Sequence, residues 1–324
     1  MTAHPGAAPE DHPSGDGAAT AVLLMAYGSP RAPDEVLPYY THMRGGRAPA
    51  PAALAELERR YQAIGGSSPL QAITRAQAQG LEAELAARGL GWKVAVGMKH
   101  SPPLIEDAVR ALAEDGPRSV VGLVLAPHFS AMSVGEYLVR ARTAAELLPY
   151  PPQIRFVSDW HLAPGYISWL GARVDEVRQS LAAQDHLEPL VIFTAHSLPA
   201  RLRQLGDPYP DQLGETARAV AAACGLDRWT TAWQSVAHTG EPWLGPELAA
   251  VVEQEAGAGT NAFLVCPCGF TADHLEILYD LDLEARQQAE RLQVAWARTP
   301  MPNADPTFVK VLADLVQDAP EGGP

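Results

Sequence analysis

Residues 190–195 read LVIFTA and lead directly into the polar pair His196-Ser197. An almost continuously apolar run of this length is typical of a parallel β-strand that is covered on both faces. Further runs of the same kind alternate with segments of helical spacing; they cover residues 21–26, 93–98, 119–126, 154–157, 230–235 and 262–266. Strands that alternate with helices predict an α/β protein with right-handed crossovers between parallel strands.

The helical segments have recognisable stripes and ends. In residues 167–181, apolar side chains recur at steps of three and four, which predicts a helix with one apolar face. Asp305 and Pro306 are suited to the N-cap and the first position of a last helix. Ser133 and Glu136 have the spacing of a capping box, which predicts another helix start.

Prolines cluster at residues 149–152 (PYPP), near the midpoint of the chain, and indicate a domain boundary close by. Each half holds three or four predicted strands, so we predict two similar open-sheet domains, at residues 21–158 and 159–302. A C-terminal helix and tail occupy residues 303–324. Residues 1–20 contain no Val, Ile, Leu or aromatic residue, so they cannot supply the apolar core of a signal peptide and are predicted to be a disordered tail.

The charge balance excludes several classes of protein. The chain has 324 residues, with 24 Lys and Arg against 38 Asp and Glu, and a formal net charge of −14. A nucleic-acid binder is disfavoured because it needs clustered basic side chains. Cys224, Cys266 and Cys268 are too few for a disulfide framework and fit a reducing compartment, so we predict a cytoplasmic protein. No run approaches the ~20 apolar residues of an integral membrane anchor.

Chemically useful residues follow several predicted strands. These strands end in Tyr27, in Lys99-His100, in His128 and in His196. Ligands of open α/β sheets bind at the carboxyl ends of the strands, so these residues are expected near a binding site. A single histidine in such a place is more often structural, but three of them exceed what structural use requires.

The segment after the last predicted strand carries an acidic ladder. Glu276, Asp280 and Glu284 are spaced four apart, so they share one face of a predicted helix. Most such series are solvated acidic faces. This helix starts just past a strand end, however, and acidic residues beside a histidine suit a divalent cation.

The sequence lacks the common motifs of several other enzyme classes. The chain contains no GxSxG, P-loop, HExxH or CxxC motif. Cys266-Pro267-Cys268 fits small buried thiols better than metal ligands, and three cysteines cannot supply a four-cysteine iron–sulfur cluster. Ser197 beside His196 does not suit a serine hydrolase, because neighbours on an extended chain point to opposite sides.

Taken together and in order, the strand-end segments resemble the ferrochelatases, in particular the bacterial ones that use coproporphyrin. The resemblance covers almost the whole chain after residue 20 and rests on LLMAYGSP, YYTHMRGGRAP, RYQAIGGSSPL, GMKHSPP, LAPHFSAMSVGEY, TAHSLP, GDPYPDQL, AWQSVAHTGEPWLGP and CPCGFTADHLEILYDLDLEA. It implies two Rossmann-like, chelatase-type domains with parallel sheets and a tetrapyrrole in the cleft between them.

The resemblance also implies roles for single residues. His196 of TAHSLP and Glu276 of DHLE would be the catalytic pair, facing the porphyrin and binding the metal. Asp280 and Glu284 would extend this metal site along a route for the hydrated ion. Tyr27 of MAYGSP would lie on the opposite face of the porphyrin, as an axial ligand or near one.

The propionates of the porphyrin would lie near a second set of residues. Arg44, Ser68, Tyr137 and Lys99 match positions of this kind. Gly45 is a departure, because the family often has a second basic residue after the arginine of THxR, and part of the propionate contact set is therefore expected to differ.

The implied function is the insertion of Fe²⁺ into coproporphyrin III, which gives coproheme and two protons in haem biosynthesis. Fe²⁺ is then a substrate; no tightly bound cofactor or iron–sulfur cluster is expected, and a monomer is the default. One alternative is a protoporphyrin IX ferrochelatase, which usually associates with membranes, although no apolar lip or anchor helix is visible here. Others are a cobalt or nickel chelatase and a non-catalytic haem or porphyrin carrier, which would not need the acidic ladder.

Overall fold

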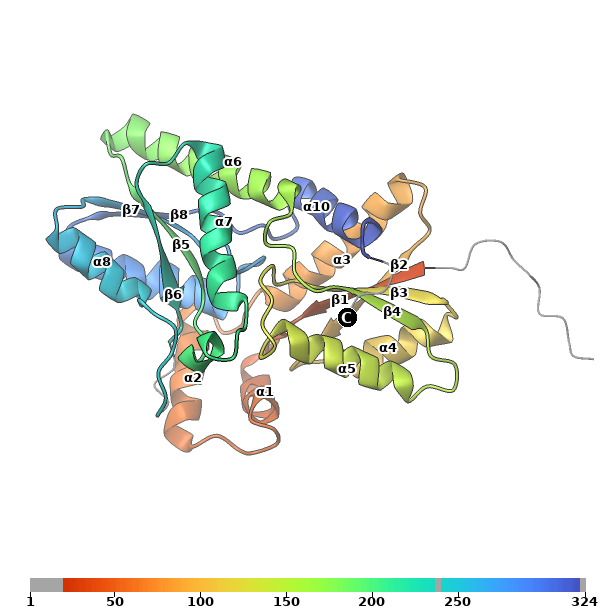
Figure 1. Ribbon diagram of the computed structural model, residues 1–324. Coiled ribbons are helices and arrows are strands. Elements are labelled where there is room, and N and C mark those ends of the chain that lie inside the picture. Colours follow the sequence, from red (N-terminus) through yellow and green to blue (C-terminus); the bar gives the residue numbers. More distant parts are fainter. Residues whose placement is uncertain (1–19, 237–239, 321–324) are drawn as a thin grey trace, which may run out of the picture.

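The computed structural model describes residues 20–236 and 240–320, and these residues form two four-stranded parallel sheets. The first has the strand order β2-β1-β3-β4 and the second β6-β5-β7-β8, so the two share one topology (Figure 1). Every pairing between neighbouring strands is parallel. The strands are β1 (Thr20–Ala26), β2 (Lys93–Met98), β3 (Ser119–Val124), β4 (Gln153–Val157), β5 (Leu190–His196), β6 (Trp229–Gln234), β7 (Ala262–Cys266) and β8 (Ala295–Arg298).

Helices cover both faces of each sheet. Around the first sheet, α4 and α5 lie on one face and α3 and α10 on the other (Figure 1). The α-helices are α1 (Val36–Met43), α2 (Pro51–Ala63), α3 (Leu70–Ala87), α4 (Ile105–Glu114), α5 (Val134–Glu146), α6 (Pro164–Asp185), α7 (Tyr209–Cys224), α8 (Leu248–Gly257), α9 (Arg286–Leu292) and α10 (Pro306–Gln317). Two 3₁₀-helices, η1 (Pro33–Glu35) and η2 (Ala200–Arg203), and one π-helix, η3 (Ile277–Ala285), complete the described helices.

The core explains why the strands are apolar throughout. In β1, Leu23 and Met25 pack with the residues of α4 and α5, whereas Val22 and Leu24 point to the opposite face, as the two-residue period of a strand requires. The apolar side chains on that second face belong to the same core cluster as Phe193 of β5, in the other half of the chain. One apolar core therefore joins the two sheets and holds their strand ends in a fixed relation.

All seven predicted strands are present, and their ends agree with the predictions to within two residues. The prediction missed β8, which has the sequence AWAR and pairs with β7 at the edge of the second sheet. Its residues are only partly buried. A short edge strand of this kind needs no continuous apolar run, so it carries no clear sequence signal.

The predicted helix ends have different outcomes. Asp305 accepts hydrogen bonds of 2.8 and 3.1 Å from backbone N–H groups in the first turn of α10, so the predicted N-cap is confirmed. The predicted helix start is confirmed, because Ser133 is the N-cap of α5, but the predicted capping box is wrong. Ser133 Oγ accepts a 2.6 Å hydrogen bond from the N–H of the next residue. The Glu136 carboxylate does not bind back to the backbone of Ser133 and pairs with the Lys99 ammonium. A charged partner forms a stronger hydrogen bond than a backbone N–H.

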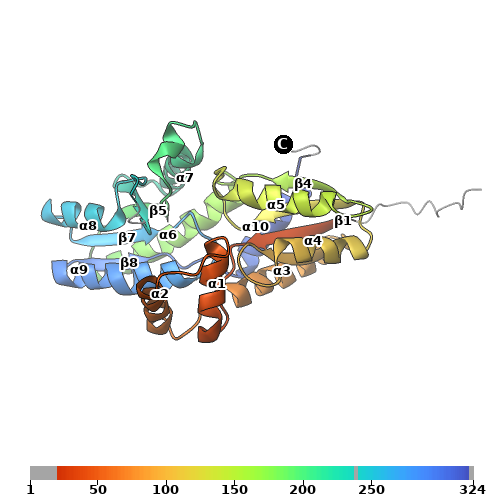
Figure 2. The ribbon, with the colours of Figure 1, turned by 90° about the horizontal axis from the view of Figure 1, so that it is seen from below.

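Some elements link the two halves of the chain. Helix α10 packs on α3 and α6. Helices α1 and α2 lie beside each other where the two halves of the chain meet, with α2 on the side of the second sheet (Figures 1 and 2). Their residues Val36 and Tyr61 form a small apolar cluster with Leu275 and Tyr279 near the start of η3. The domain boundaries after residues 158 and 302 stay predictions. Residues 1–19 of the predicted N-terminal tail and 321–324 of the predicted C-terminal tail lie outside the described residues, and Thr20, the last residue of the predicted N-terminal tail, is instead the first residue of β1.

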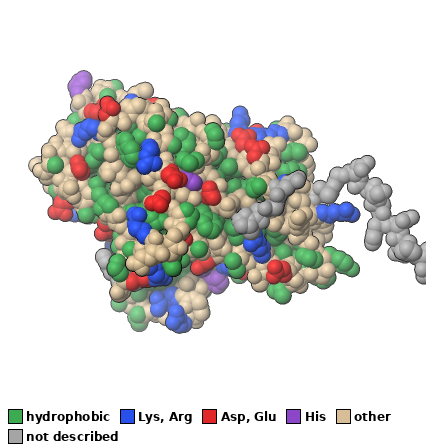
Figure 3. Space-filling view, viewed as in Figure 1, with side chains coloured by type: hydrophobic (Ala, Val, Ile, Leu, Met, Phe, Trp, Pro, Cys, Tyr) green, Lys and Arg blue, Asp and Glu red, His purple; other side chains and the backbone are tan. Residues whose placement is uncertain are grey.

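The surface carries charges of both signs. On the face drawn in Figure 3, Lys and Arg side chains are interspersed with Asp and Glu and do not gather into one basic patch. Within the described part of the chain, no helix combines the length and the apolar character that crossing a membrane requires.

Candidate functional site

The structure brings the predicted catalytic pair together at the strand ends of the second sheet. His196 is the last residue of β5, and Glu276 immediately precedes η3. Nε2 of His196 lies 3.4 Å from Oε1 of Glu276. Nε2 of a further histidine, His274, lies 3.7 Å from Oε2 of the same carboxylate. Within residues 20–236 and 240–320, no three or more histidine, cysteine and acidic side chains are arranged to hold a metal ion by themselves.

The His196 ring has a defined orientation. Its Nδ1 lies 2.5 Å from the carbonyl oxygen of Ser197. A carbonyl only accepts, so Nδ1 carries the hydrogen of this contact. In the neutral imidazole the lone pair therefore resides on Nε2, the nitrogen that faces Glu276.

Charge pairing decides the protonation of this site. Desolvation lowers the pKa of His196, but the charge and hydrogen bond of Glu276 outweigh it and raise the pKa from 6.5 to about 9. Burial acts to raise the pKa of Glu276, yet the positive charge of His196 holds it well below 4.5. At neutral pH the pair is thus an imidazolium and a carboxylate, and Nε2 must lose its proton before it can accept another or bind a metal.

The acidic ladder continues along η3. One oxygen of Asp280 pairs with Arg60 of α2, and the other accepts a 2.6 Å hydrogen bond from Ser235 Oγ. Desolvation and the nearby charge of Glu276 nevertheless raise the pKa of Asp280 from 3.8 to about 6. Glu284 is exposed. The series therefore consists of two partly buried carboxylates, Glu276 and Asp280, and an exposed one, Glu284. It lies on a π-helix, whose turns are wider than those of an α-helix.

Tyr27 approaches from the end of β1, in the other half of the chain. Its side chain is 42% exposed, and its ring centroid lies 4.7 Å from that of His100. The pKa of the Tyr27 phenol is raised because its surroundings desolvate it and the Glu276 and Glu136 carboxylates oppose a phenolate. The Glu276 carboxylate therefore influences the protonation of the Tyr27 phenol from the other half of the chain.

The predicted propionate contacts fall into two groups. Lys99 and Tyr137 are buried close to Tyr27: the Lys99 ammonium lies 5.8 Å from the Tyr27 ring centroid and 5.2 Å from that of Tyr137. Ser68 is buried at the start of α3, where its hydroxyl accepts a backbone N–H at 3.2 Å. Arg44 is exposed at the end of α1, with its guanidinium 5.9 Å from a tyrosine ring of that helix. The roles of these residues stay predictions.

The predicted cleft for the tetrapyrrole also stays a prediction. Two cavities of about 380 and 440 Å³ are described, one at the start of α7 and one between α6 and α10. Neither is lined by Tyr27, His196 or Glu276.

Sequence reasoning missed several residues around the site. Arg60 and Ser235 bind Asp280, and His274 contacts Glu276. Arg60 lies 220 residues from its partner, and no local spacing connects the two. His274 stands next to the ladder in the sequence, so its proximity to Glu276 was the one available signal.

Two parallel sheets of one topology, joined by a common core and carrying a histidine–carboxylate pair at the strand ends, define a chelatase-type α/β protein. Solved structures agree on the fold. The sirohydrochlorin chelatase SirB from Bacillus subtilis subspecies spizizenii, in complex with cobalt, superposes with a TM-score of 0.55 at 10% identity and covers 93% of this chain and 94% of its own. DR2241 from Deinococcus radiodurans gives a TM-score of 0.53 at 14% identity over 95% of this chain and 57% of its own.

The sequence identifies the family. The Ferrochelatase family model matches residues 19–319, and the chain therefore belongs to the ferrochelatase family. The coproporphyrin III ferrochelatase of Anoxybacillus flavithermus is 42% identical over 298 residues, which are 91% of this chain and 94% of the relative. That of Listeria innocua is 42% identical over 301 residues, 92% of this chain and 97% of the relative. The predicted fold and family are both confirmed.

Proposed function

We propose that this protein inserts Fe²⁺ into coproporphyrin III to give coproheme. The names of its relatives support the choice of porphyrin. The observation that carries the reaction type is the His196–Glu276 pair, with Nε2 and Oε1 3.4 Å apart at the strand ends of the second sheet.

The chain's residues suit the proton chemistry of the reaction. Insertion replaces two pyrrole N–H protons by one Fe²⁺, so two protons must leave the porphyrin. Neutral His196 accepts the two pyrrole protons one after the other at Nε2 and releases each to solvent, which its partly exposed side chain can reach, while its Nδ1–H stays bound to the Ser197 carbonyl. Glu276 stabilises the imidazolium that forms, as a fixed charge next to a developing one does in a site shielded from water.

Metal delivery uses the acidic ladder. Glu284 is exposed and meets the hydrated ion first, and Asp280 follows toward Glu276. Asp280 has a pKa of about 6, so it is ionised at neutral pH and places a negative oxygen along the route of the divalent ion. On the other side, Tyr27 contacts the opposite porphyrin face, and Lys99, buried beside it, supplies a cation for a propionate.

Metal insertion also requires that the porphyrin nitrogens be accessible. The macrocycle is planar, and its lone pairs point inward. A site that holds the ring buckled exposes them at a strain of roughly 1–5 kcal/mol, which binding elsewhere on the substrate can supply.

An anaerobic absorbance assay with Fe²⁺ tests the proposal, with coproporphyrin III and protoporphyrin IX run side by side. We expect rapid loss of the coproporphyrin bands and little change with protoporphyrin. The opposite preference would make the protein a protoporphyrin ferrochelatase. Tight binding of both porphyrins without insertion would contradict an enzyme and favour a carrier.

A variant tests the catalytic assignment. We expect His196→Ala to abolish turnover and to leave coproporphyrin binding within a few-fold, because the imidazole acts on protons and metal and not on the propionates. His186→Asn, at an exposed histidine beyond α6, is the matched control and should keep full activity. Lost binding in His196→Ala, with turnover intact per bound substrate, would refute the assignment.

The proposal extends to the state of the enzyme. It acts as a monomer and needs neither a bound cofactor nor an iron–sulfur cluster. It works in the cytoplasm, and its three cysteines fit such a reducing compartment. Size-exclusion chromatography with light scattering and elemental analysis of the purified protein test these points.

A further inference from the structure

The loop before α7 makes an unusual set of contacts with the other half of the chain. In the 207–212 segment (DPYPDQ), Oδ2 of Asp207 accepts hydrogen bonds from Ser130 Oγ at 3.0 Å and from the Ala131 N–H at 2.9 Å. Oε1 of Gln212 accepts the Phe129 N–H at 2.7 Å. Two side chains of the 207–212 segment therefore bind the loop that follows β3 of the first sheet.

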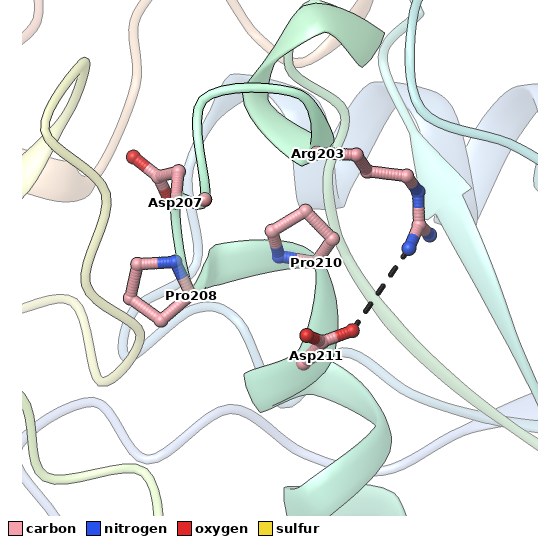
Figure 4. Close-up of a pocket in the computed structure, with 6 residues that line it drawn as sticks. Arg203, Asp207, Pro208, Pro210 and Asp211 are labelled. Carbon is pink, nitrogen blue, oxygen red and sulfur yellow. Dashed lines mark ion pairs between the residues drawn. The ribbon is translucent and has the colours of Figure 1, made fainter.

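Figure 4 shows how Asp207 is directed. Arg203 and Asp211 form an ion pair of 3.9 Å on one side of a cavity of about 380 Å³, and the Asp207 carboxylate points away from that pair. Its other oxygen, Oδ1, accepts the Tyr209 N–H at 3.0 Å. One carboxylate thus connects the β3 loop to the backbone at Tyr209.

Tyr209 continues the connection to the catalytic pair. Its hydroxyl donates a 2.8 Å hydrogen bond to the backbone carbonyl of His196. The Tyr209 side chain is 7% exposed, and its ring lies 5.5 Å from that of Trp233, so the hydroxyl cannot easily move away. Burial also raises the pKa of Tyr209, and the hydroxyl remains a donor at any working pH.

The His196 carbonyl belongs to the peptide that leads to Ser197, whose own carbonyl binds Nδ1 of the imidazole. If this peptide rotates, the Ser197 carbonyl oxygen moves, and with it the acceptor that sets the orientation of the His196 ring. Errors in position of about 1 Å at a reacting group can lower a rate by about 100-fold.

From these contacts we infer that Tyr209 is a positioning residue for His196 and that Asp207 anchors it to the half of the protein that carries Tyr27. The inference rests on the proposed function, because it assigns Tyr209 an effect only through His196. The 207–212 segment then fixes the position of the His196 imidazole relative to Tyr27, the residue proposed for the opposite face of the porphyrin.

The test compares two buried tyrosines. Tyr166 donates a hydrogen bond of the same 2.8 Å length to a backbone carbonyl, that of Cys268, and is fully buried. Tyr209→Phe and Tyr166→Phe therefore remove the same kind of bond and should lower the melting temperature similarly. We expect kcat for coproporphyrin III and Fe²⁺ to fall by about 10- to 100-fold in Tyr209→Phe with KM within about twofold, and to stay within about twofold in Tyr166→Phe.

A second variant keeps the inference open to refutation if Tyr209→Phe is unstable. Asp207→Asn weakens the anchor and should lower kcat in the same direction. Because both residues belong to one connection, the double variant should lose less activity than the product of the two single losses. Independent, multiplying losses would overturn the inference.

The remaining outcomes separate the inference from the proposed function. Equal kcat values for Tyr209→Phe and Tyr166→Phe, with an active wild-type protein, would overturn the positioning role alone. A wild-type protein that binds coproporphyrin and inserts no iron would overturn both.

Discussion

Replacement of Gly28 by alanine is expected to destabilise the protein through two effects that can be separated. Gly28 directly follows Tyr27 and has a φ of +89°, which costs an L-residue roughly 1–2 kcal/mol. A Cβ at this position would lie 2.3 Å from Ser101 Oγ and 3.1 Å from the Ser101 backbone nitrogen. Such overpacking costs about 1–3 kcal/mol, so the two effects sum to about 2–5 kcal/mol of lost unfolding free energy.

Ser101 cannot simply turn aside. Its Oγ accepts hydrogen bonds from the Ser29 N–H at 3.2 Å and from Gln71 Nε2 at 3.0 Å, and all three residues are buried. A rotation of Ser101 would leave the Ser29 N–H without its acceptor, although Gln71 Nε2 would keep its bond to the Ser29 carbonyl. A buried unsatisfied polar group costs about 1–3 kcal/mol.

Urea unfolding followed by tryptophan fluorescence measures the effect against two control glycines. Gly89 has a φ of +81° and no atom within 4 Å of the place that a Cβ would take, whereas Gly91 has open space and no such φ. Gly89→Ala should therefore lose only the roughly 1–2 kcal/mol of the backbone effect, and Gly91→Ala should change stability by no more than about 1 kcal/mol.

The contact with Ser101 has its own check. Ser101→Ala removes the atom at 2.3 Å, so Gly28→Ala should cost about 1–3 kcal/mol less in that background than in the wild type. If Gly28→Ala is no more destabilising than Gly89→Ala, the reasoning is refuted, because only the backbone effect would remain.

Three further predictions concern protonation and ligation. kcat/KM should rise with pH up to about 9, the pKa of His196 in the free protein, because the neutral imidazole is the active form; a flat profile between pH 7 and 9 would contradict this. Complete burial lowers the pKa of His128 from 6.5 to about 3, so the unfolded chain binds this proton first and stability falls as the pH drops below 6.5. Between pH 7 and 5 the wild type should lose about 2 kcal/mol more unfolding free energy than His128→Gln in urea titrations, and equal losses would exclude a neutral buried His128. Tyr27→Phe should alter the absorbance of the bound coproheme more than the rate of insertion, and an unchanged spectrum would rule out axial ligation.

The strands could be predicted from the sequence because a strand that is buried on both faces needs only a short run of apolar residues. LVIFTA and AVLLMA are buried on both faces, and an apolar run is all that such a position requires. The N-cap at Asp305 was predictable for the same reason, since its partners are the next N–H groups along the chain.

Predictions from neighbouring residues were wrong where a residue distant in the sequence binds the same side chain. Ser133 and Glu136 have the spacing of a capping box, yet Glu136 pairs with Lys99, which follows a different strand. The helix after Glu276 is also a π-helix over nine residues, and the four-residue spacing of its acidic side chains is equally compatible with an α-helix.

The sequence by itself determined the α/β class, the order of the strands along the chain, the acidic charge and, through its motifs, the family and the names of the candidate residues. Only the tertiary structure decided how those residues act on each other. Arg60 and Asp280 are 220 residues apart, and Tyr209 reaches the His196 carbonyl from a separate helix. The direction of each pKa shift likewise depends on burial and on charges a few ångströms away in space, and those distances exist only once the crossovers have folded the two sheets against each other.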